Sequence, residues 1–158
     1  MDIVVGVDGS NASIDALRWS LDEARLRGDA SVVVVHAYRV PDGRTPEVHV
    51  SPHLPPDLAR KAAGQGRDRR DEQYALAREH AEALVEKAIT EADPDDGDVR
   101  IKRAVFAQEP AQVLIEMSEE ADLLVVSSRG LGGFRGLLMG SVSQQVVQHA
   151  HCPVAVVR

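Results

Sequence analysis

Aromatic residues and cysteines are scarce in this chain, and long apolar runs are missing. Aromatic residues make up 3% of the 158 positions, which argues against a protein that stacks nucleic-acid bases on a series of rings. A single cysteine excludes an internal disulfide framework and fits a reducing compartment. No apolar run approaches the ~20 residues of a membrane span, and no basic-then-apolar signal opens the chain. These absences predict a cytoplasmic protein that does not enter membranes.

A basic surface is also missing. The formal net charge is −7, whereas a general binder of nucleic acid or anionic membranes needs a basic face. Apolar residues amount to 44% of the chain, enough for a sizeable core. No internal repeat divides the sequence. We therefore expect one domain over residues 1–158, with neither nucleic acid nor membrane as a partner.

Hydrophobic patterns predict five strands, and the second of them contains four consecutive valines, as expected of a strand buried on both faces in a parallel sheet. The strands are expected at residues 2–7, 31–37, 99–105, 123–126 and 153–157. Apolar residues at helical spacing predict four helices, each lying between two successive strands. The helix between the second and third strands is preceded by a long irregular connection. The first helix is expected to begin near Ser10 and end at Gly28, and the third to begin at Pro110. This order predicts a layered α/β domain with helices on both faces of the sheet.

Residues 39–70 interrupt this rhythm with five prolines and three glycines. A loop of this length inside a compact domain is unusual. We expect a mobile insertion there; a lid with a defined role is the alternative.

The most informative stretch is 122–143, where a buried strand leads into a glycine-rich loop and then a helix. Five glycines fall within the eleven residues from Gly130 to Gly140, and Ser141 and Ser143 open the helix. Such a loop lets backbone N–H groups approach a phosphate, and a helix N-terminus attracts anions. The pattern indicates phosphate or nucleotide binding; the alternative is that the glycines only allow a tight path. The loop is not a Walker A motif, because the lysine before the hydroxyl residue is missing.

The sequence offers no metal or catalytic constellation. His149 and His151 are two residues apart near a helix end and point in different directions, and no second cysteine joins Cys152 in a zinc set. We expect structural roles for all three, with Cys152 as a small buried apolar residue. Acidic residues around 116–122 are most simply a solvated helix face.

Several segments together resemble the universal stress protein family. They are Ile3–Ser10, Val35–Ala37, Ala121–Val126, Gly130–Ser143 and Cys152–Val157, and the resemblance spans essentially the whole chain outside 39–70. It implies an adenine nucleotide alpha hydrolase-like three-layer sandwich whose five-stranded parallel sheet has the order 3-2-1-4-5. Strands 1 and 4 would then be neighbours at a topological switch point, where ligands bind beyond the carboxyl ends of strands.

The resemblance also implies a site for ATP or a related adenine nucleotide, with Mg²⁺ as a possible companion. Asp8 and Ala37 would border adenine and ribose, Val7 and Val126 would form the walls, and phosphates would meet the loop and helix N-terminus. The residues implied there are Ser127, Gly130, Gly133, Gly140, Ser141, Val142 and Ser143. Arg129 and Arg135 are our own additions as phosphate partners; solvated loop charges are their alternative. Asp8 has the alternative of a turn or cap residue.

This chain departs from the nucleotide-binding pattern Gly-x2-Gly-x9-Gly at two places. Gly130 and Gly140 match its second and third glycines, but Ser127 replaces the first. Gln108 stands where the turn before Pro110 often carries glycine. Two functions follow: a nucleotide-binding stress-response regulator, or a homodimeric interaction module whose pocket these residues have closed.

Under either function we expect a homodimer through the C-terminal strand Val154–Val157, because an apolar edge strand invites a second copy. We expect no enzyme of ordinary speed. At most, the protein would hydrolyse ATP or phosphorylate itself slowly, with Ser141 as the nearest hydroxyl.

Overall fold

The computed structural model describes residues 1–39, 69–93, 97–131 and 139–158. Most of the insertion predicted at 39–70 therefore lies outside the described residues, as does the middle of the glycine-rich loop. At the end of that insertion the prediction is wrong by two residues: Arg69 and Arg70 already belong to a helix. No glycine or proline follows Gly66 for more than twenty residues, so nothing in the sequence delays the helix start.

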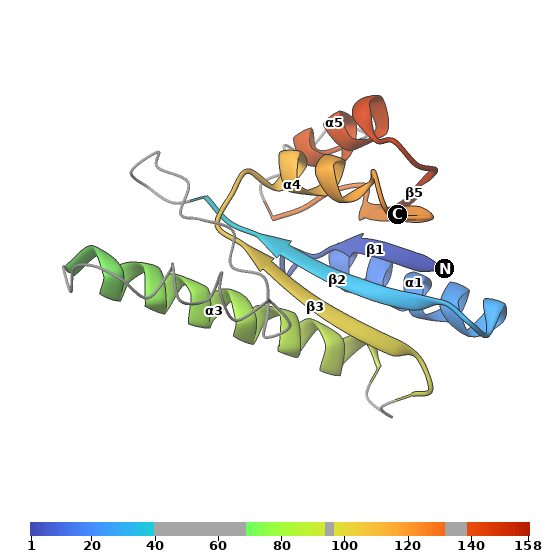
Figure 1. Cartoon of the computed structure of the whole chain (residues 1–158), viewed down its shortest axis with the longest axis horizontal. Helices are drawn as coiled ribbons and strands as arrows, with labels where there is room; N and C mark the ends of the chain where they lie inside the picture. The colour runs from blue at the N-terminus through green and yellow to red at the C-terminus, as the bar shows by residue number, and fades with distance from the viewer. Residues whose placement is uncertain (40–68, 94–96, 132–138) are drawn as a thin grey trace.

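Five strands form one sheet, and every neighbouring pair is parallel (Figure 1). Their order is β3-β2-β1-β4-β5, as the resemblance implied. The strands are β1 (Asp2–Gly6), β2 (Ser31–Ala37), β3 (Arg100–Phe106), β4 (Leu123–Ser127) and β5 (Val154–Val157). β1 and β4 are neighbours although more than a hundred residues separate them, with Val5 opposite Val125.

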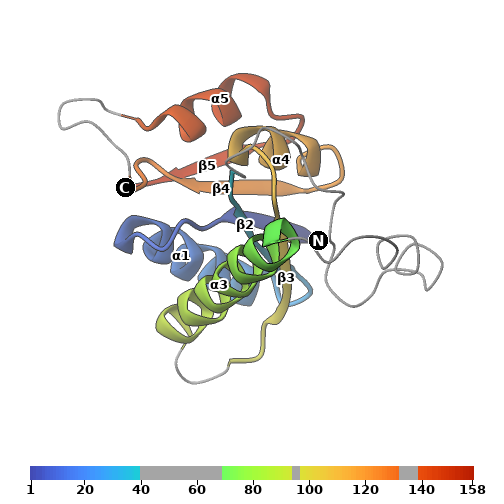
Figure 2. The ribbon, with the colours of Figure 1, turned by 90° about the vertical axis from the view of Figure 1, so that its left-hand side faces the viewer.

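In the described part of the chain, four helices cover the two faces of the sheet, giving three layers (Figure 2). α1 (Asn11–Arg27) and α3 (Arg69–Ala92) lie on one face and pack against each other. α4 (Pro110–Met117) and α5 (Ser141–His149) lie together on the other. Each face has its own apolar core, which explains why β1, β2 and β4 are buried on both sides and read as continuous apolar runs. The predicted fold class is confirmed.

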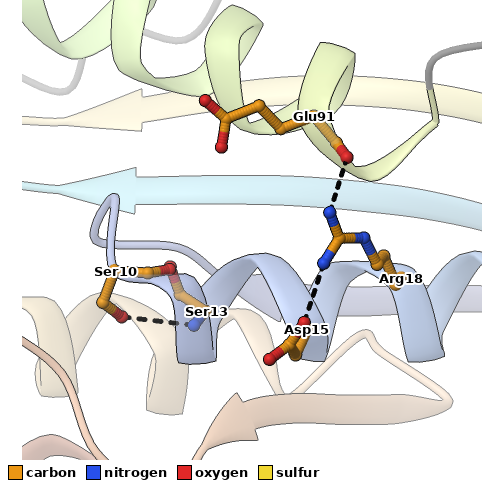
Figure 3. Close-up of polar contacts among 5 residues, drawn as sticks. All are labelled: Ser10, Ser13, Asp15, Arg18 and Glu91. Atoms are coloured by element: carbon orange, nitrogen blue, oxygen red, sulfur yellow. Dashed lines mark hydrogen bonds and ion pairs between the residues drawn. The ribbon is translucent and has the colours of Figure 1, made fainter.

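Side-chain and backbone caps set the ends of α1. The Ser10 hydroxyl accepts the N–H of Ser13 at 3.2 Å (Figure 3). Gly28 ends the helix in the left-handed conformation with φ +78°, and its N–H donates to the Ala24 carbonyl. Arg18 ties α1 to α3, since its guanidinium donates both to Asp15 at 2.8 Å and to the Glu91 carbonyl at 2.9 Å. These contacts define both ends of α1 and hold it against α3.

Two further expectations can be compared with the structure. Pro110 is in the first turn of α4, as predicted. Cys152, by contrast, is only half-buried and packs at the margin of the α4/α5 core, because it lies in the turn that leads into an edge strand. Among the residues described, no helix is both long and apolar enough to cross a membrane.

Candidate functional site

A cavity opens beyond the carboxyl ends of β1, β2 and β4, between the first turns of α4 and α5. Its volume is about 280 Å³. It lies where β1 and β4 are neighbours, which is the switch point of the sheet. The residues that line it are Gly6, Val7, Asp8, Val35, Ala37, Pro110, Leu114, Val126, Ser127, Gly130, Leu131, Gly140, Ser141, Val142 and Ser143.

Ten of the thirteen site residues named from the sequence line this one cavity. They come from the ends of three strands and the start of α5: Val7, Asp8, Ala37, Val126, Ser127, Gly130, Gly140, Ser141, Val142 and Ser143. Arg129 is exposed and is not part of the wall. Gly133 and Arg135 lie outside the described residues. The structure therefore assembles most of the predicted set, and folding alone brings together positions more than a hundred residues apart.

One side of the cavity is apolar. Val35, Val126 and Leu114 belong to the core between the sheet and the α4/α5 layer, and their outer ends reach the cavity wall. Val7 and Val142 complete this side. An apolar wall with a few polar groups is the usual composition of a small-molecule site, in which the wall receives a flat or aliphatic part of the ligand.

Another part of the wall is the N-terminus of α5. Gly140 is the N-cap in an extended conformation, with φ −75° and ψ 163°, and it has no side chain to cap the helix. The N–H groups of the first turn, at Ser141, Val142 and Ser143, have no intrahelical acceptor and carry the positive end of the helix dipole. This end of the cavity can accept an anion through backbone donors.

The two serines of that turn differ in what their hydroxyls do. The Ser143 hydroxyl is buried and donates to the Ser127 carbonyl at 2.6 Å. Ser141 is exposed. Both hydroxyls were expected to face a phosphate, but that of Ser143 already donates to a protein carbonyl. The backbone N–H of Ser143 is still one of the first-turn donors of α5.

Asp8 bridges the two loops of the site, which are the turn between β1 and α1 and the glycine-rich loop after β4. Its Oδ1 accepts the N–H of Ser10 at 3.0 Å and the Ser10 hydroxyl at 2.6 Å. Its Oδ2 accepts the N–H of Leu131 at 2.9 Å, across from the other loop. The turn role considered for Asp8 is thus confirmed, and the same side chain also forms part of the cavity wall.

The ionisation of Asp8 follows from these bonds. Burial raises the pKa of the carboxyl, but the hydrogen bonds from Ser10, Leu131 and Ser13 outweigh burial and leave the pKa below its ordinary value. At neutral pH the cavity wall therefore carries one fixed negative charge. An anionic ligand has to bind away from it, toward the α5 N-terminus.

Ser127, which replaces the first glycine of the nucleotide-binding pattern, does not fill the cavity. Its side chain turns back on its own loop, and the hydroxyl donates to the Arg129 carbonyl at 2.8 Å. Gln108, the second departure, is absent from the cavity wall. The expectation that these two residues have closed the pocket is not met by the cavity described here.

Reading the sequence missed five wall residues: Gly6, Val35, Pro110, Leu114 and Leu131. Val35 could have been found, because residues two apart on a strand share a face and Ala37 was already named. Leu114 and Pro110 could not, since their place depends on how α4 packs across the ends of the strands.

Within the described residues, no three His, Cys, Asp or Glu side chains are grouped so that they could hold a metal ion. His149 and His151 are exposed. The backbone N–H of His151 donates to the Ser118 hydroxyl at 2.8 Å, which joins the turn before β5 to the end of α4. The structural interpretation of this region agrees with these contacts.

A model of the universal stress protein family matches residues 1–158. The chain belongs to this family. A universal stress protein of Mycobacterium tuberculosis strain H37Rv is 35% identical over 156 residues, which are 99% of this chain but 44% of that relative. The chain thus spans less than half the length of the curated relatives it matches.

Solved universal stress proteins share the fold. UspA from Lactobacillus plantarum is 22% identical with a TM-score of 0.63, covering all of this chain and 97% of that one. A universal stress protein solved in complex with cyclic AMP is 26% identical with a TM-score of 0.56, covering all of this chain and 96% of that one. As a universal stress protein, this chain keeps a cavity at the switch point while differing from the nucleotide-binding pattern at Ser127.

Proposed function

We propose that this universal stress protein binds an adenine nucleotide in the switch-point cavity. The observation that carries the proposal is the pairing of an apolar wall with an uncapped helix N-terminus in one cavity of about 280 Å³. Adenine and ribose would occupy the side of Val7, Val35 and Val126, near Asp8 and Ala37. The phosphate would meet the first-turn N–H groups of α5. The relative solved with cyclic AMP supports this ligand class.

The size of the cavity favours one nucleotide with a short phosphate tail. Ligand pockets typically measure about 300–1,000 Å³, so this cavity of about 280 Å³ lies just below that range. ATP would fit only with its outer phosphates beyond the described wall, where Mg²⁺ would neutralise them. The outer phosphates of ATP would make no contact with the described wall. We therefore expect AMP or cyclic AMP to bind with at least the affinity of ATP.

We do not expect efficient catalysis. Both carboxylate oxygens of Asp8 already accept hydrogen bonds, so this group is poorly placed to activate water. Slow hydrolysis or self-phosphorylation at the exposed Ser141 is the most that we propose. The role is that of a cytoplasmic stress-response regulator whose state depends on nucleotide occupancy.

Dimerisation through β5 is part of the proposal. β5 is an edge strand of four apolar residues, each half-buried. The opposite edge strand, β3, carries Arg100, Lys102 and Arg103, which discourage pairing with another chain. A second copy is therefore expected at β5 rather than β3.

Isothermal titration tests nucleotide binding. AMP, ADP, ATP and cyclic AMP are titrated with and without Mg²⁺ into the wild-type chain and two matched variants. Ala37→Phe places a ring in the cavity and should abolish binding. Ala83→Phe adds the same ring at an exposed position of α3 and should bind as wild type.

Absence of heat with every nucleotide, on protein that circular dichroism shows to be folded, would reject the proposal. It would favour the second function, a homodimeric interaction module without nucleotide. That alternative draws on the fixed negative charge of Asp8 in the wall, which disfavours an anionic ligand. Sedimentation of the same sample would show whether it is dimeric.

A further inference from the structure

The backbone from Ser127 to Leu131 is held by five hydrogen bonds although it leaves regular structure after β4. Three of them close the loop at its base. The Ser128 N–H donates to the Val157 carbonyl at 2.7 Å, the Gly140 N–H to the Ser128 carbonyl at 2.7 Å, and the Ser143 hydroxyl to the Ser127 carbonyl at 2.6 Å. The base of the loop is therefore anchored to β5 and to α5.

The other two bonds come from side chains in the cavity wall. The Ser127 hydroxyl donates to the Arg129 carbonyl at 2.8 Å, and the Asp8 carboxylate accepts the Leu131 N–H at 2.9 Å. These bonds hold the backbone immediately before and immediately after Gly130. Within the described part of the chain, the Gly130 N–H itself has no protein acceptor, and Gly130 lies in the cavity wall.

The arrangement also explains why position 130 is glycine. A Cβ there would overlap the Oδ2 of Asp8, so any other residue would push the carboxylate off the Leu131 N–H. Glycine at 130, aspartate at 8 and serine at 127 are thus parts of one contact set. We call the two side-chain bonds on either side of Gly130 the clamp.

We propose that Asp8 and Ser127 are positioning residues that hold the Gly130 peptide in a binding-ready conformation before the ligand arrives. This inference rests on the proposed nucleotide function and deepens it. The replacement of the first pattern glycine by Ser127 would then not abolish binding. Ser127 supplies a hydroxyl that fixes the loop from within, and the ligand would accept the Gly130 N–H, which has no acceptor in the described part of the chain.

The expected size of the effect follows from one hydrogen bond. Fixing a loop in its bound conformation raises affinity by removing the cost of ordering it on binding. A neutral hydrogen bond of ordinary strength corresponds to about a fivefold change in an equilibrium constant. Loss of the Ser127 hydroxyl should therefore weaken nucleotide binding about fivefold and loosen the loop to a similar extent.

Two measurements on the full chain test the clamp. Hydrogen exchange of the Leu131 amide reports the loop without any ligand, and titration with AMP reports affinity. Ser127→Ala and Ser127→Gly remove the hydroxyl, whereas Ser127→Thr keeps it. Asp8→Ala removes the carboxylate and is measured by hydrogen exchange only. Ser20→Ala is the matched control, because Ser20 is a buried serine of α1 whose hydroxyl donates to the Ala16 carbonyl far from the cavity.

We expect Leu131 exchange about fivefold faster in Ser127→Ala and Ser127→Gly, and AMP affinity about fivefold lower in both. Asp8→Ala removes a charge-assisted acceptor from the Leu131 N–H, so exchange there should be at least about tenfold faster. Ser127→Thr and Ser20→Ala should match wild type in both measurements. Unchanged exchange in Ser127→Ala, or tighter AMP binding in Ser127→Gly, would overturn the clamp. If wild type binds no nucleotide, the proposed function fails, and the exchange rates alone still decide whether the clamp exists.

Discussion

Asp8 and Ser127 lie at the ends of neighbouring strands, and their side chains bond to backbone groups only two residues apart. At the scale of single residues, these two side chains pair with the loop backbone by hydrogen bonds. The hydroxyls of Ser127 and Ser143 are directed at loop carbonyls, and the first-turn N–H groups of α5 are left for a ligand.

Gly130→Ala tests the close approach of Asp8 to the loop. The added Cβ would displace the carboxylate, so the Leu131 N–H should lose its acceptor and AMP should bind at least about fivefold more weakly. Calorimetry measures the affinity. Gly28→Ala, far from the cavity, is the control for substituting a glycine and should bind AMP as wild type does. Wild-type affinity in Gly130→Ala would show that the Asp8 contact does not matter for binding.

Acidification provides a second test at Asp8. Because hydrogen bonds lower the pKa of its carboxyl in the folded protein, the stabilisation from Asp8 is fully present above about pH 4 and is lost as the pH falls through the lowered pKa. The amide resonance of Leu131 should therefore move only below about pH 4. The Leu124 amide, which donates to the Pro153 carbonyl, should not follow it. A Leu131 titration between pH 5 and 6 would contradict this assignment.

Among the elements, α1 and α5 present their N-termini to the same end of the sheet but begin differently. α1 starts at a serine cap whose hydroxyl satisfies one of the free N–H groups, whereas α5 starts at a glycine that satisfies none through its side chain. Of these two helices, α5, which has no side-chain cap, is the one whose first turn borders the cavity. The C-terminal end of α1 also has a glycine, Gly28, because the backbone there is in the left-handed conformation.

Gly28→Ala should destabilise the protein by about 1 kcal/mol, because φ is +78° there and a side chain in the left-handed region is strained. No atom lies within 4 Å of the added Cβ, so the effect comes from backbone conformation and not from a clash. Urea unfolding measures it. Gly28→Asn should cost less, since asparagine tolerates this region better; equal losses in the two variants would argue against the conformational explanation.

At the scale of the whole molecule, the two edges of the sheet differ. β3 pairs its charges with neighbours, Lys102 with Asp2 at 3.2 Å and Arg103 with Glu86 at 2.5 Å. β5 offers only Val154–Val157. In β5, the carbonyls of Pro153 and Val157 bond to β4, so the alternate residues Val154 and Val156 direct their backbone groups to the open edge.

Val156→Pro should therefore convert the expected dimer into a monomer. Proline removes the outward N–H of residue 156 and leaves the bonds to β4 in place, and edge strands tolerate it. Sedimentation velocity at micromolar concentration measures the change, with circular dichroism to confirm folding. Val156→Ala keeps the N–H and should remain dimeric. A monomeric wild type, or a dimeric Val156→Pro, would remove β5 as the interface.

Much of the fold could be read from the sequence because its causes are local or periodic. Four valines in a row indicate a strand buried on both sides, and Ser10, Gly28 and Pro110 mark helix ends by their own conformational preferences. The strand order came from resemblance to the universal stress protein family. The start of α3 was placed too late, since arginine and acidic residues do not distinguish a solvated helix from a solvated loop.

The amino-acid order alone marked the glycine-rich loop and the start of the helix after it, because glycines allow a close backbone approach and a helix N-terminus attracts anions. Most other residues of the cavity wall were named through the resemblance to the universal stress protein family. Only the tertiary structure decided where side chains point. The Ser127 hydroxyl turns to the Arg129 carbonyl, and the Asp8 carboxylate reaches Leu131 across 123 positions of sequence. Such bonds depend on distances and angles that exist only after β1 and β4 have paired, and no spacing along the chain encodes them.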